Sequence, residues 1–251
     1  MASGLLLGNP VASTNIQPVD PKAVLAALRS APPPDPPWVR RTSGTVQNLN
    51  SVSCASSSTC IAVGDAGTIL VTVDGGQSWQ RRISGTIDHL ISANCSNDRS
   101  CVAVGYGDNL SIEPVILTTS NGGISWLIQH LGSYNYQLSV SCTSDGCCVS
   151  TGNYGEILAR GTFGATWRSR ASGTMDTLEG VSCWNSHQRV AVGVPVNDTG
   201  GLNDTVVLLL NTHDGDNSWH GQPAGTSQGL NGVGCSIDGR CVAVGLGRLR
   251  H

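Results

Sequence analysis

The sequence is poor in the residue types that several classes of partner require. Only 12% of its 251 residues are charged, its net charge is −3, and Lys22 is its one lysine. Nucleic acids and anionic membranes are bound by concentrated basic side chains, and the chain has no polybasic run. No apolar run approaches the length of a transmembrane helix. We therefore expect neither a nucleic-acid partner nor a transmembrane segment.

Recognisable sets of catalytic or metal-binding residues are also missing. The six histidines are scattered, without the spacing of metal ligands and without a matching serine and aspartate. Residues 214–218 resemble the start of a calcium loop, but Gly225 stands where the bidentate acid belongs. We expect no metal and no cofactor.

What the chain has instead is a repeat of about forty to fifty residues. In each unit a tryptophan precedes a cysteine by sixteen residues, and a glycine follows that cysteine by ten. The tryptophans are Trp38, Trp79, Trp126, Trp167 and Trp219, and the cysteines are Cys54, Cys95, Cys142, Cys183 and Cys235. A repeat of this length with short strands predicts an all-β fold, a β-propeller with four strands in each blade. Five units predict five blades, over residues 38–251.

The first complete unit shows where we expect the strands. Glycine and serine turns separate four short runs, which we assign as strands A (Leu49–Cys54), B (Cys60–Gly64), C (Thr68–Thr72) and D (Ser78–Ile83). All length variation between units falls after strand B, because the spacing from tryptophan to glycine is constant. The insertions, Tyr106–Pro114 and Val194–Asp204, are therefore expected in the B–C loops, which share one face of a propeller with the D–A loops.

Residues 1–37 form a separate N-terminal extension. Its pattern predicts a short helix over Lys22–Ser30 and a stiff proline-rich linker over Ala31–Pro37. The last unit stops after strand B, so the ring is either truncated or completed by N-terminal strands. For the second case we expect Gly4–Gly8 as strand C and Trp38–Thr42 as strand D of the last blade.

Ten cysteines indicate how the hairpins are held. Four pairs have five residues between their members, which suits facing positions on two antiparallel strands joined by a short loop. We predict the disulfides Cys54–Cys60, Cys95–Cys101, Cys142–Cys148 and Cys235–Cys241, with zinc sites and free thiols as the alternatives. Cys147 and Cys183 are left over, either as free thiols or as a bridge between blades. Disulfides predict an extracellular or cell-envelope location, although the first residues do not form a signal peptide.

The segment Thr72–Trp79, TVDGGQSW, resembles the Asp-box (BNR) motif of bacterial sialidases, sortilin-type receptors and xyloglucanases. With the Ala-Val-Gly and Gly-Thr-Ile-Leu segments, the whole unit is most similar to the photosystem II assembly factor-like repeat proteins of bacteria. The resemblance covers residues 38–245 and implies a propeller in which the aspartate and glycines shape a turn and the tryptophan packs between blades. Asn121 and Asp216 depart from the motif, at its aspartate and its second glycine.

For function we favour a non-enzymatic binding or scaffold module, monomeric, that recognises a protein or a glycan on the B–C and D–A loop face. Exposed tyrosine, asparagine and aspartate suit adaptable contacts. The candidate binding residues there are Tyr106, Asp108, Tyr134, Tyr136, Tyr154 and Asn197. An assembly factor for a membrane protein complex follows from the resemblance alone.

A glycoside hydrolase is the enzymatic alternative, and it requires two facing carboxylates. The acids expected near that face are Asp65, Asp88, Asp108, Glu113, Glu156 and Asp176. Turn and loop roles explain the same residues without catalysis.

Long polar side chains recur three residues after the tryptophans, on the expected outer strands. Arg41, Arg82 and Arg170 are the arginines among them. They form either a rim that binds carboxylates of a partner or a charged edge that prevents sheet-to-sheet pairing.

Overall fold

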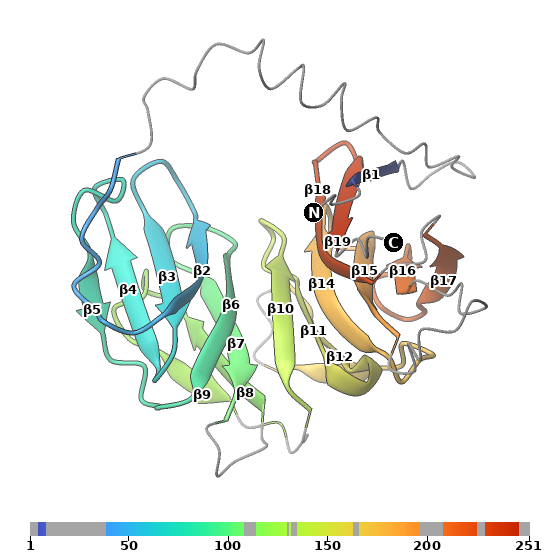
Figure 1. Cartoon of the computed structure of the whole chain (residues 1–251), viewed down its shortest axis with the longest axis horizontal. Helices are drawn as coiled ribbons and strands as arrows, with labels where there is room; N and C mark the ends of the chain where they lie inside the picture. The colour runs from blue at the N-terminus through green and yellow to red at the C-terminus, as the bar shows by residue number, and fades with distance from the viewer. Residues whose placement is uncertain are drawn as a thin grey trace, which may run out of the picture.

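The computed structural model is an all-β fold of five antiparallel sheets arranged in an arc (Figure 1). It describes residues 5–8, for the backbone only, and residues 39–107, 114–129, 131, 135–162, 166–195, 208–224 and 229–245. Four sheets have four strands and the fifth has three. The chain is thus a β-propeller with five blades, as the repeat count predicts. In the part of the chain that is described, no helix is long and apolar enough to span a membrane.

Each blade is numbered in chain order. Blade 1 contains β2 (Leu49–Cys54), β3 (Cys60–Gly64), β4 (Thr68–Thr72) and β5 (Gln80–Arg82). Blade 2 contains β6 (His89–Cys95), β7 (Cys101–Tyr106), β8 (Pro114–Thr119) and β9 (Leu127–Gln129). Blade 3 contains β10 (Gln137–Cys142), β11 (Cys148–Gly152), β12 (Ile157–Arg160) and β13 (Arg168–Arg170), with the short 3-10 turn η1 (Asn153–Gly155). Blade 4 contains β14 (Thr177–Cys183), β15 (Arg189–Val194), β16 (Leu208–Thr212) and β17 (His220–Pro223), and blade 5 contains β18 (Leu230–Cys235), β19 (Cys241–Gly245) and β1 (Leu5–Gly8).

The strands follow the predicted pattern closely. Strands A, B and C of the first unit have the predicted bounds, while strand D is shorter, at Gln80–Arg82. Both insertions lie between the second and third strands of their blades, where the sequence predicts them. From Trp79 onward, the constant stretch from each tryptophan to the next glycine therefore begins just before the outer strand of one blade and ends on the second strand of the next.

Neighbouring blades pack face to face through aliphatic side chains. We call the face that contacts the preceding blade the leading face of a blade, and the opposite face its trailing face. At the first junction the trailing face of blade 1 supplies Ile61, Val63, Ile69 and Val71, and the leading face of blade 2 supplies Leu90, Ala93, Ala103, Leu117 and Trp126. Equivalent clusters join blades 2 and 3, 3 and 4, and 4 and 5. Trp126, Trp167 and Trp219 each pack at such a junction, as the motif implies.

A ladder of side-chain hydrogen bonds also joins the inner strands. Two side chains on each of β2, β6 and β10, and one on β14, accept hydrogen bonds from backbone N–H groups of the next inner strand. The contacts are Ser51 to Ala93 at 3.1 Å, Ser53 to Cys95 at 3.0 Å, Ser92 to Val140 at 3.1 Å, Asn94 to Cys142 at 3.0 Å, Ser139 to Val181 at 3.2 Å, Ser141 to Cys183 at 3.0 Å and Ser182 to Cys235 at 3.0 Å. Satisfying these donors fixes how far each blade is rotated against the next.

All four predicted disulfides are present, and they close the hairpins between the first two strands of blades 1, 2, 3 and 5. Cys147 and Cys183 are free thiols. The alternative of a bridge between them is therefore wrong.

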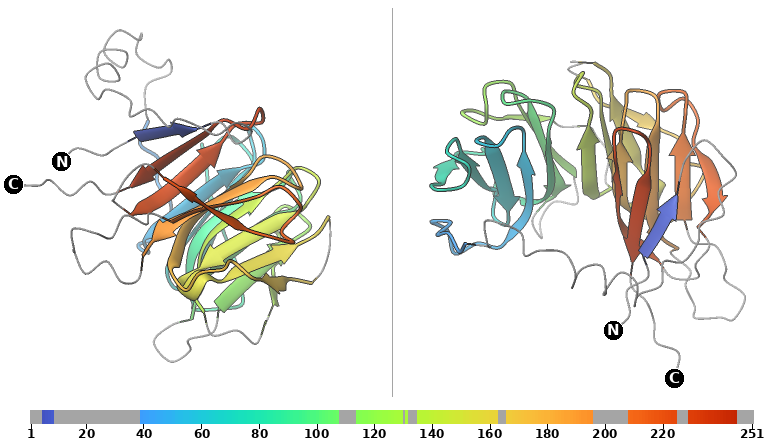
Figure 2. Two further views of the ribbon diagram at one scale, coloured as in Figure 1. Left: turned by 90° about the vertical axis from the view of Figure 1, so that its right-hand side faces the viewer. Right: turned by 90° about the horizontal axis from the view of Figure 1, so that it is seen from above.

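The prediction that N-terminal strands complete the last blade is confirmed for strand C and wrong for strand D. β1 pairs with β19 at the position of strand C, with Leu5 opposite Val244 and Leu7 opposite Val242. Val39–Thr42, predicted as strand D, is not a strand. Blades 1 and 5 lie at the two ends of the arc, as Figure 1 and the right-hand view of Figure 2 show. The predicted helix at Lys22–Ser30 and the linker Ala31–Pro37 lie outside the described residues.

Candidate functional site

The B–C and D–A loops of blades 1 to 3 bring four polar and aromatic residues together. Asp65 follows β3, His89 begins β6, Tyr106 ends β7, and Tyr136 directly precedes β10. His89 and Tyr106 face each other in the register of β6 and β7. We call these four residues the loop-face cluster.

Asp65 holds the cluster together by its carboxylate. It accepts hydrogen bonds from Asn48 Nδ2 at 2.9 Å, from Asn50 Nδ2 at 3.0 Å and from His89 Nδ1 at 3.0 Å. These hydrogen bonds lower the pKa of Asp65 to about 2, and the bond from Asn50 contributes most. The carboxylate is therefore ionised at neutral pH and can only accept, so His89 Nδ1 carries the hydrogen of this bond.

From the carboxylate of Asp65, the cluster continues through three aromatic rings toward blade 3. The centroids of His89 and Tyr106 are 5.4 Å apart, and those of Tyr106 and Tyr136 are 4.7 Å apart, each pair tilted by 36°. Such spacings give favourable aromatic contact. Two rings of blade 2 and one ring of the loop before blade 3 thus form one partly exposed platform.

Tyr154 extends the platform on blade 3. It lies in η1 with a positive φ of 55° and is 57% exposed. The N–H of its neighbour Asn153 donates to the carbonyl of Tyr136 at 3.1 Å. Of the predicted binding residues, Tyr106, Tyr136 and Tyr154 therefore share one region. Asp108, Tyr134 and Asn197 lie outside the described residues.

Sequence reasoning overlooked His89 and gave Asp65 only as an acid near this face. The available signal was position: both residues flank strands at the same end of their blades. The repeat pattern could not point to His89, because no other unit has a histidine at the equivalent position.

The predicted arginines do not join the cluster. Arg82 and Arg170 end the outer strands β5 and β13 at equivalent register positions, opposite Ile69 and Ile157. The Nη2 of Arg82 donates to Gln80 at 2.9 Å. Arg41 lies outside any strand, on a groove beside Leu49.

Of the acids named for a glycosidase, Asp65 is bonded within the loop-face cluster, and two others are bonded within their own loops. Asp88 accepts from Thr86, and Asp176 accepts from Thr174 at 2.8 Å. Glu156 is buried. Glu113 and Asp108 are outside the described residues. Burial raises the pKa of Glu179, on the inner strand β14.

The motif turns are built as the Asp-box resemblance implies. In blade 1, Asp74 accepts from the N–H of Ser78 at 2.9 Å and from its hydroxyl at 2.6 Å, while Thr72 accepts from the N–H of Gly76 at 2.9 Å. The two bonds from Ser78 lower the pKa of Asp74 to about 2, and the bond from the Ser78 hydroxyl contributes most. Gly75 and Gly76 have φ of 71° and 84°, which other residues rarely adopt. The turn is self-contained, so its carboxylate has a structural role.

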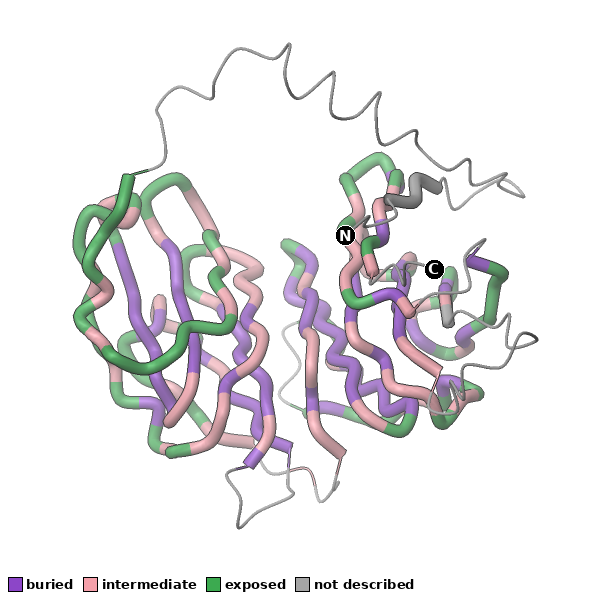
Figure 3. The backbone as a smooth tube through the Cα atoms, in the orientation of Figure 1, coloured by how far each residue is buried: buried purple, intermediate pink, exposed green. Residues whose placement is uncertain are grey.

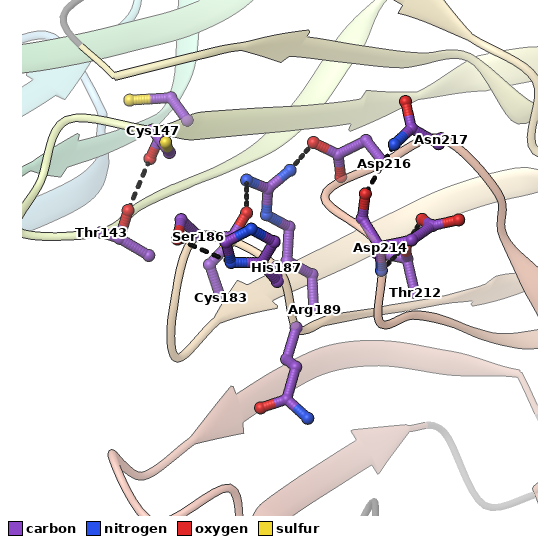
Figure 4. Close-up of polar contacts among 12 residues, drawn as sticks. Thr143, Cys147, Cys183, Ser186, His187, Arg189, Thr212, Asp214, Asp216 and Asn217 are labelled. Atoms are coloured by element: carbon purple, nitrogen blue, oxygen red, sulfur yellow. Dashed lines mark hydrogen bonds and ion pairs between the residues drawn. The ribbon is translucent and has the colours of Figure 1, made fainter.

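A second polar cluster lies at the opposite loop end of blade 4 (Figure 4). Arg189 forms an ion pair with Asp216, and its Nη2 donates to the carbonyl of Ser186 at 2.8 Å. Both side chains of the ion pair are almost fully buried. Cys183 as a residue is half-buried, but desolvation of its thiol raises its pKa to about 11. A thiol with so high a pKa is a poor nucleophile.

Three solved structures show which folds the chain is similar to. "YCF48 bound to D1 peptide" is 22% identical with a TM-score of 0.61, and the match covers 84% of this chain. This chain spans 65% of that one. "YCF48 from Cyanidioschyzon merolae" is 13% identical, with a TM-score of 0.56 over 82% of this chain and 71% of that chain. An ancestral GH74 enzyme is 16% identical, with a TM-score of 0.60 over 78% of this chain and 28% of that chain.

No protein-family model matches the chain, and no curated protein matches it. At these identities the structural likenesses establish the β-propeller fold. They include a peptide-bound protein and an enzyme, so the fold is compatible with either kind of function.

Proposed function

We propose that this chain is a non-enzymatic binding module that captures a protein segment on the loop-face cluster. The observation that carries the proposal is the platform of His89, Tyr106 and Tyr136, anchored by the ionised carboxylate of Asp65. Tyrosine offers large contact area at low cost in conformational entropy. The likeness to YCF48 bound to a D1 peptide supports a protein ligand over a glycan.

An extracellular or cell-envelope setting is part of the proposal. Four disulfides in one chain persist in oxidising compartments and are rare in a reducing cytosol. A protein partner exposed in such a compartment is therefore the class of ligand to search.

The test is a binding screen on arrayed peptides and glycans, with the variant Tyr106→Ala/Tyr136→Ala beside the original protein. We expect the double variant to lose binding at least tenfold, since about 1–2 kcal/mol for each buried ring is a usual contribution. The variant Tyr106→Phe/Tyr136→Phe keeps the rings, so we expect it to retain most of the binding affinity. Ile237→Ala, an exposed residue at the other loop end of blade 5, is the matched control.

The glycoside hydrolase remains the competing function, supported by the likeness to a GH74 enzyme. The same screen should record cleavage as well as binding. Glycan turnover that Asp65→Asn or Glu156→Gln abolishes, in a variant with unchanged thermal stability, would replace the binding proposal with the enzymatic one.

The assembly-factor function is a narrower form of the binding proposal. Its test is capture of a membrane protein complex from native membranes, lost in the Tyr106→Ala/Tyr136→Ala variant and retained in Ile237→Ala. Capture that the double variant keeps would place the partner elsewhere on the molecule.

A further inference from the structure

Glu179, on the inner strand of blade 4, is an acid without a partner among the described residues. It lies in β14, where every residue is buried or half-buried (Figure 3). No hydrogen bond or ion pair within the described chain reaches its carboxylate, and loss of hydration raises its pKa. An uncompensated charge in such a place is costly in the free protein, and a bound cation would remove that cost.

Glu179 lies close to the loop face, because β14 begins at that face. The register of β14 shifts at Glu179, as the register of β2 shifts at Asn50. Such a bulge leaves one residue outside the paired ladder and re-aims its side chain. From this position Asn50 donates to Asp65 and to the carbonyl of Leu90, each at 3.0 Å. Glu179 is the counterpart of Asn50 in blade 4, so we expect its carboxylate at the same level of the loop face.

The aromatic platform lies between these two acids. Asp65 stands at its blade 1 end. The rings that follow are His89, Tyr106 and Tyr136. At the blade 3 end, η1, which contains Tyr154, packs against β14. A row of rings therefore runs from one carboxylate toward the strand that carries the other.

The fixed charges of these loops have one sign. In blades 1 to 4, the B–C loops and the D–A loops that precede each blade contain acids, among them Asp65, Asp88 and Asp176, but no lysine and no arginine. The arginines nearest to them in sequence, Arg82 and Arg170, end outer strands, at the far edge of each sheet from the inner strands. Tyrosine faces also attract cations. The centre of the loop face is therefore suited to a positively charged group.

We propose that the loop-face cluster binds a positively charged protein segment, whose lysine or arginine side chains lie on the tyrosine rings and pair with Asp65 and Glu179. The inference rests on the proposed function and adds the charge of the ligand to it. A neutral or acidic segment that covered Glu179 would bury its charge without a partner, which opposes binding. A basic segment compensates the same charge.

The test begins with peptides of random sequence on the array described above. We expect the bound peptides to be enriched in lysine and arginine. The probe for solution measurements is the tightest-binding peptide, made once as selected and once with glutamine in place of every lysine and arginine. By fluorescence anisotropy, we expect the glutamine form to bind about tenfold more weakly, and the difference to shrink as salt is added.

Glu179→Gln separates a charge contact from a change of shape. We expect it to weaken binding of the selected peptide about fivefold and to leave binding of its glutamine form unchanged. Asp98→Asn is the matched control, because it removes an exposed carboxylate from the loop between β6 and β7, at the opposite loop end, and changes the net charge by the same amount. It should bind like the unmodified protein. Thermal melts verify that both variants are folded.

Failure of this inference differs from failure of the proposed function. Bound peptides that are not enriched in basic residues, or a Glu179→Gln variant that binds the selected peptide as tightly as the unmodified protein, overturn the inference and leave the proposed binding function intact. An array on which no peptide binds, or on which binding survives Tyr106→Ala/Tyr136→Ala, overturns both.

Discussion

At the scale of residues, the ion pair of blade 4 replaces two members of the repeat at once. Arg189 stands where blades 1, 2, 3 and 5 have the second cysteine of a disulfide, and Asp216 stands where blades 1 and 2 have a glycine. The arginine fills the space of the missing bridge, and the aspartate neutralises it. Each change without the other would leave a buried charge unpaired.

We predict that Arg189→Cys/Asp216→Gly creates a fifth disulfide. Cys183 already faces position 189 in the register of β14 and β15, as Cys54 faces Cys60. Thiol titration of unfolded, non-reduced protein should fall from two free thiols to one. Glycine also suits the φ of 75° at position 216.

The single variant Asp216→Gly gives the control for this prediction. It leaves the guanidinium of Arg189 buried without its partner, so we expect about 3–5 kcal/mol of lost unfolding free energy in urea titrations. A double variant that keeps two or more free thiols would contradict the predicted bridge.

Acid stability depends on the turn aspartates. The folded pKa of Asp74 is about 2, below its ordinary value of 3.8, so its contribution is complete above the ordinary value and is lost as pH falls toward the folded one. Asn121 makes the equivalent bonds to Thr119 and Ser125 in blade 2 without a charge. We therefore predict that Asp74→Asn flattens the loss of unfolding free energy between about pH 5 and pH 2.

The reverse change, Asn121→Asp, should steepen the same acid limb in urea titrations. Equal pH dependence in all three proteins would mean that other carboxylates dominate acid unfolding.

Residue-level features of the site were predictable in part. Tyr106 and Tyr136 could be named because they were expected on the B–C and D–A loop face and tyrosine suits binding surfaces. The contact of His89 with Asp65 could not, because it crosses from one blade to another and depends on how the blades are rotated. Sequence spacing fixes positions along a strand but not that rotation.

At the scale of elements, the ladder on the inner strands determines that rotation. Ser141 accepts from the N–H of Cys183 at 3.0 Å, and Asn94 has the same role one blade earlier. We predict that Ser141→Ala lowers unfolding free energy by about 1 kcal/mol, because a backbone donor loses its partner. Ser141→Asn should retain the bond.

Thermal unfolding of the two variants is the measurement. A Ser141→Asn protein as unstable as Ser141→Ala would show that side-chain volume at this position, not the hydrogen bond, is what matters.

The strands were predicted correctly where residues of the same repeat unit determine where a strand begins and ends. The spacing of Cys54 and Cys60 fixes the hairpin of β2 and β3, and turn glycines fix β4. It failed at Val39–Thr42, whose sequence resembles that of β5. A strand needs a partner edge as well as a suitable sequence, and among the described residues this segment pairs with none.

At the scale of the whole molecule, the arc has two ends with one uncovered face each. Repeat proteins gain much of their stability at contacts between neighbours, so terminal repeats open first. We predict that hydrogen exchange at dilute concentration is fastest in blades 1 and 5 and slowest in β10, β11 and β14. Mass spectrometry of exchanged peptides checks this, and equal protection in all five blades would contradict an open arc.

The constant stretch from tryptophan to glycine has a consequence for how such a chain grows. It carries the outer strand of one blade and the first two strands of the next, so duplication of the corresponding gene segment copies a joint between blades along with its two sides. A newly inserted unit completes the blade before it and is completed by the unit after it. Lengthening by whole units therefore never exposes an interior edge, and only the first and last units bear the cost of being unmatched.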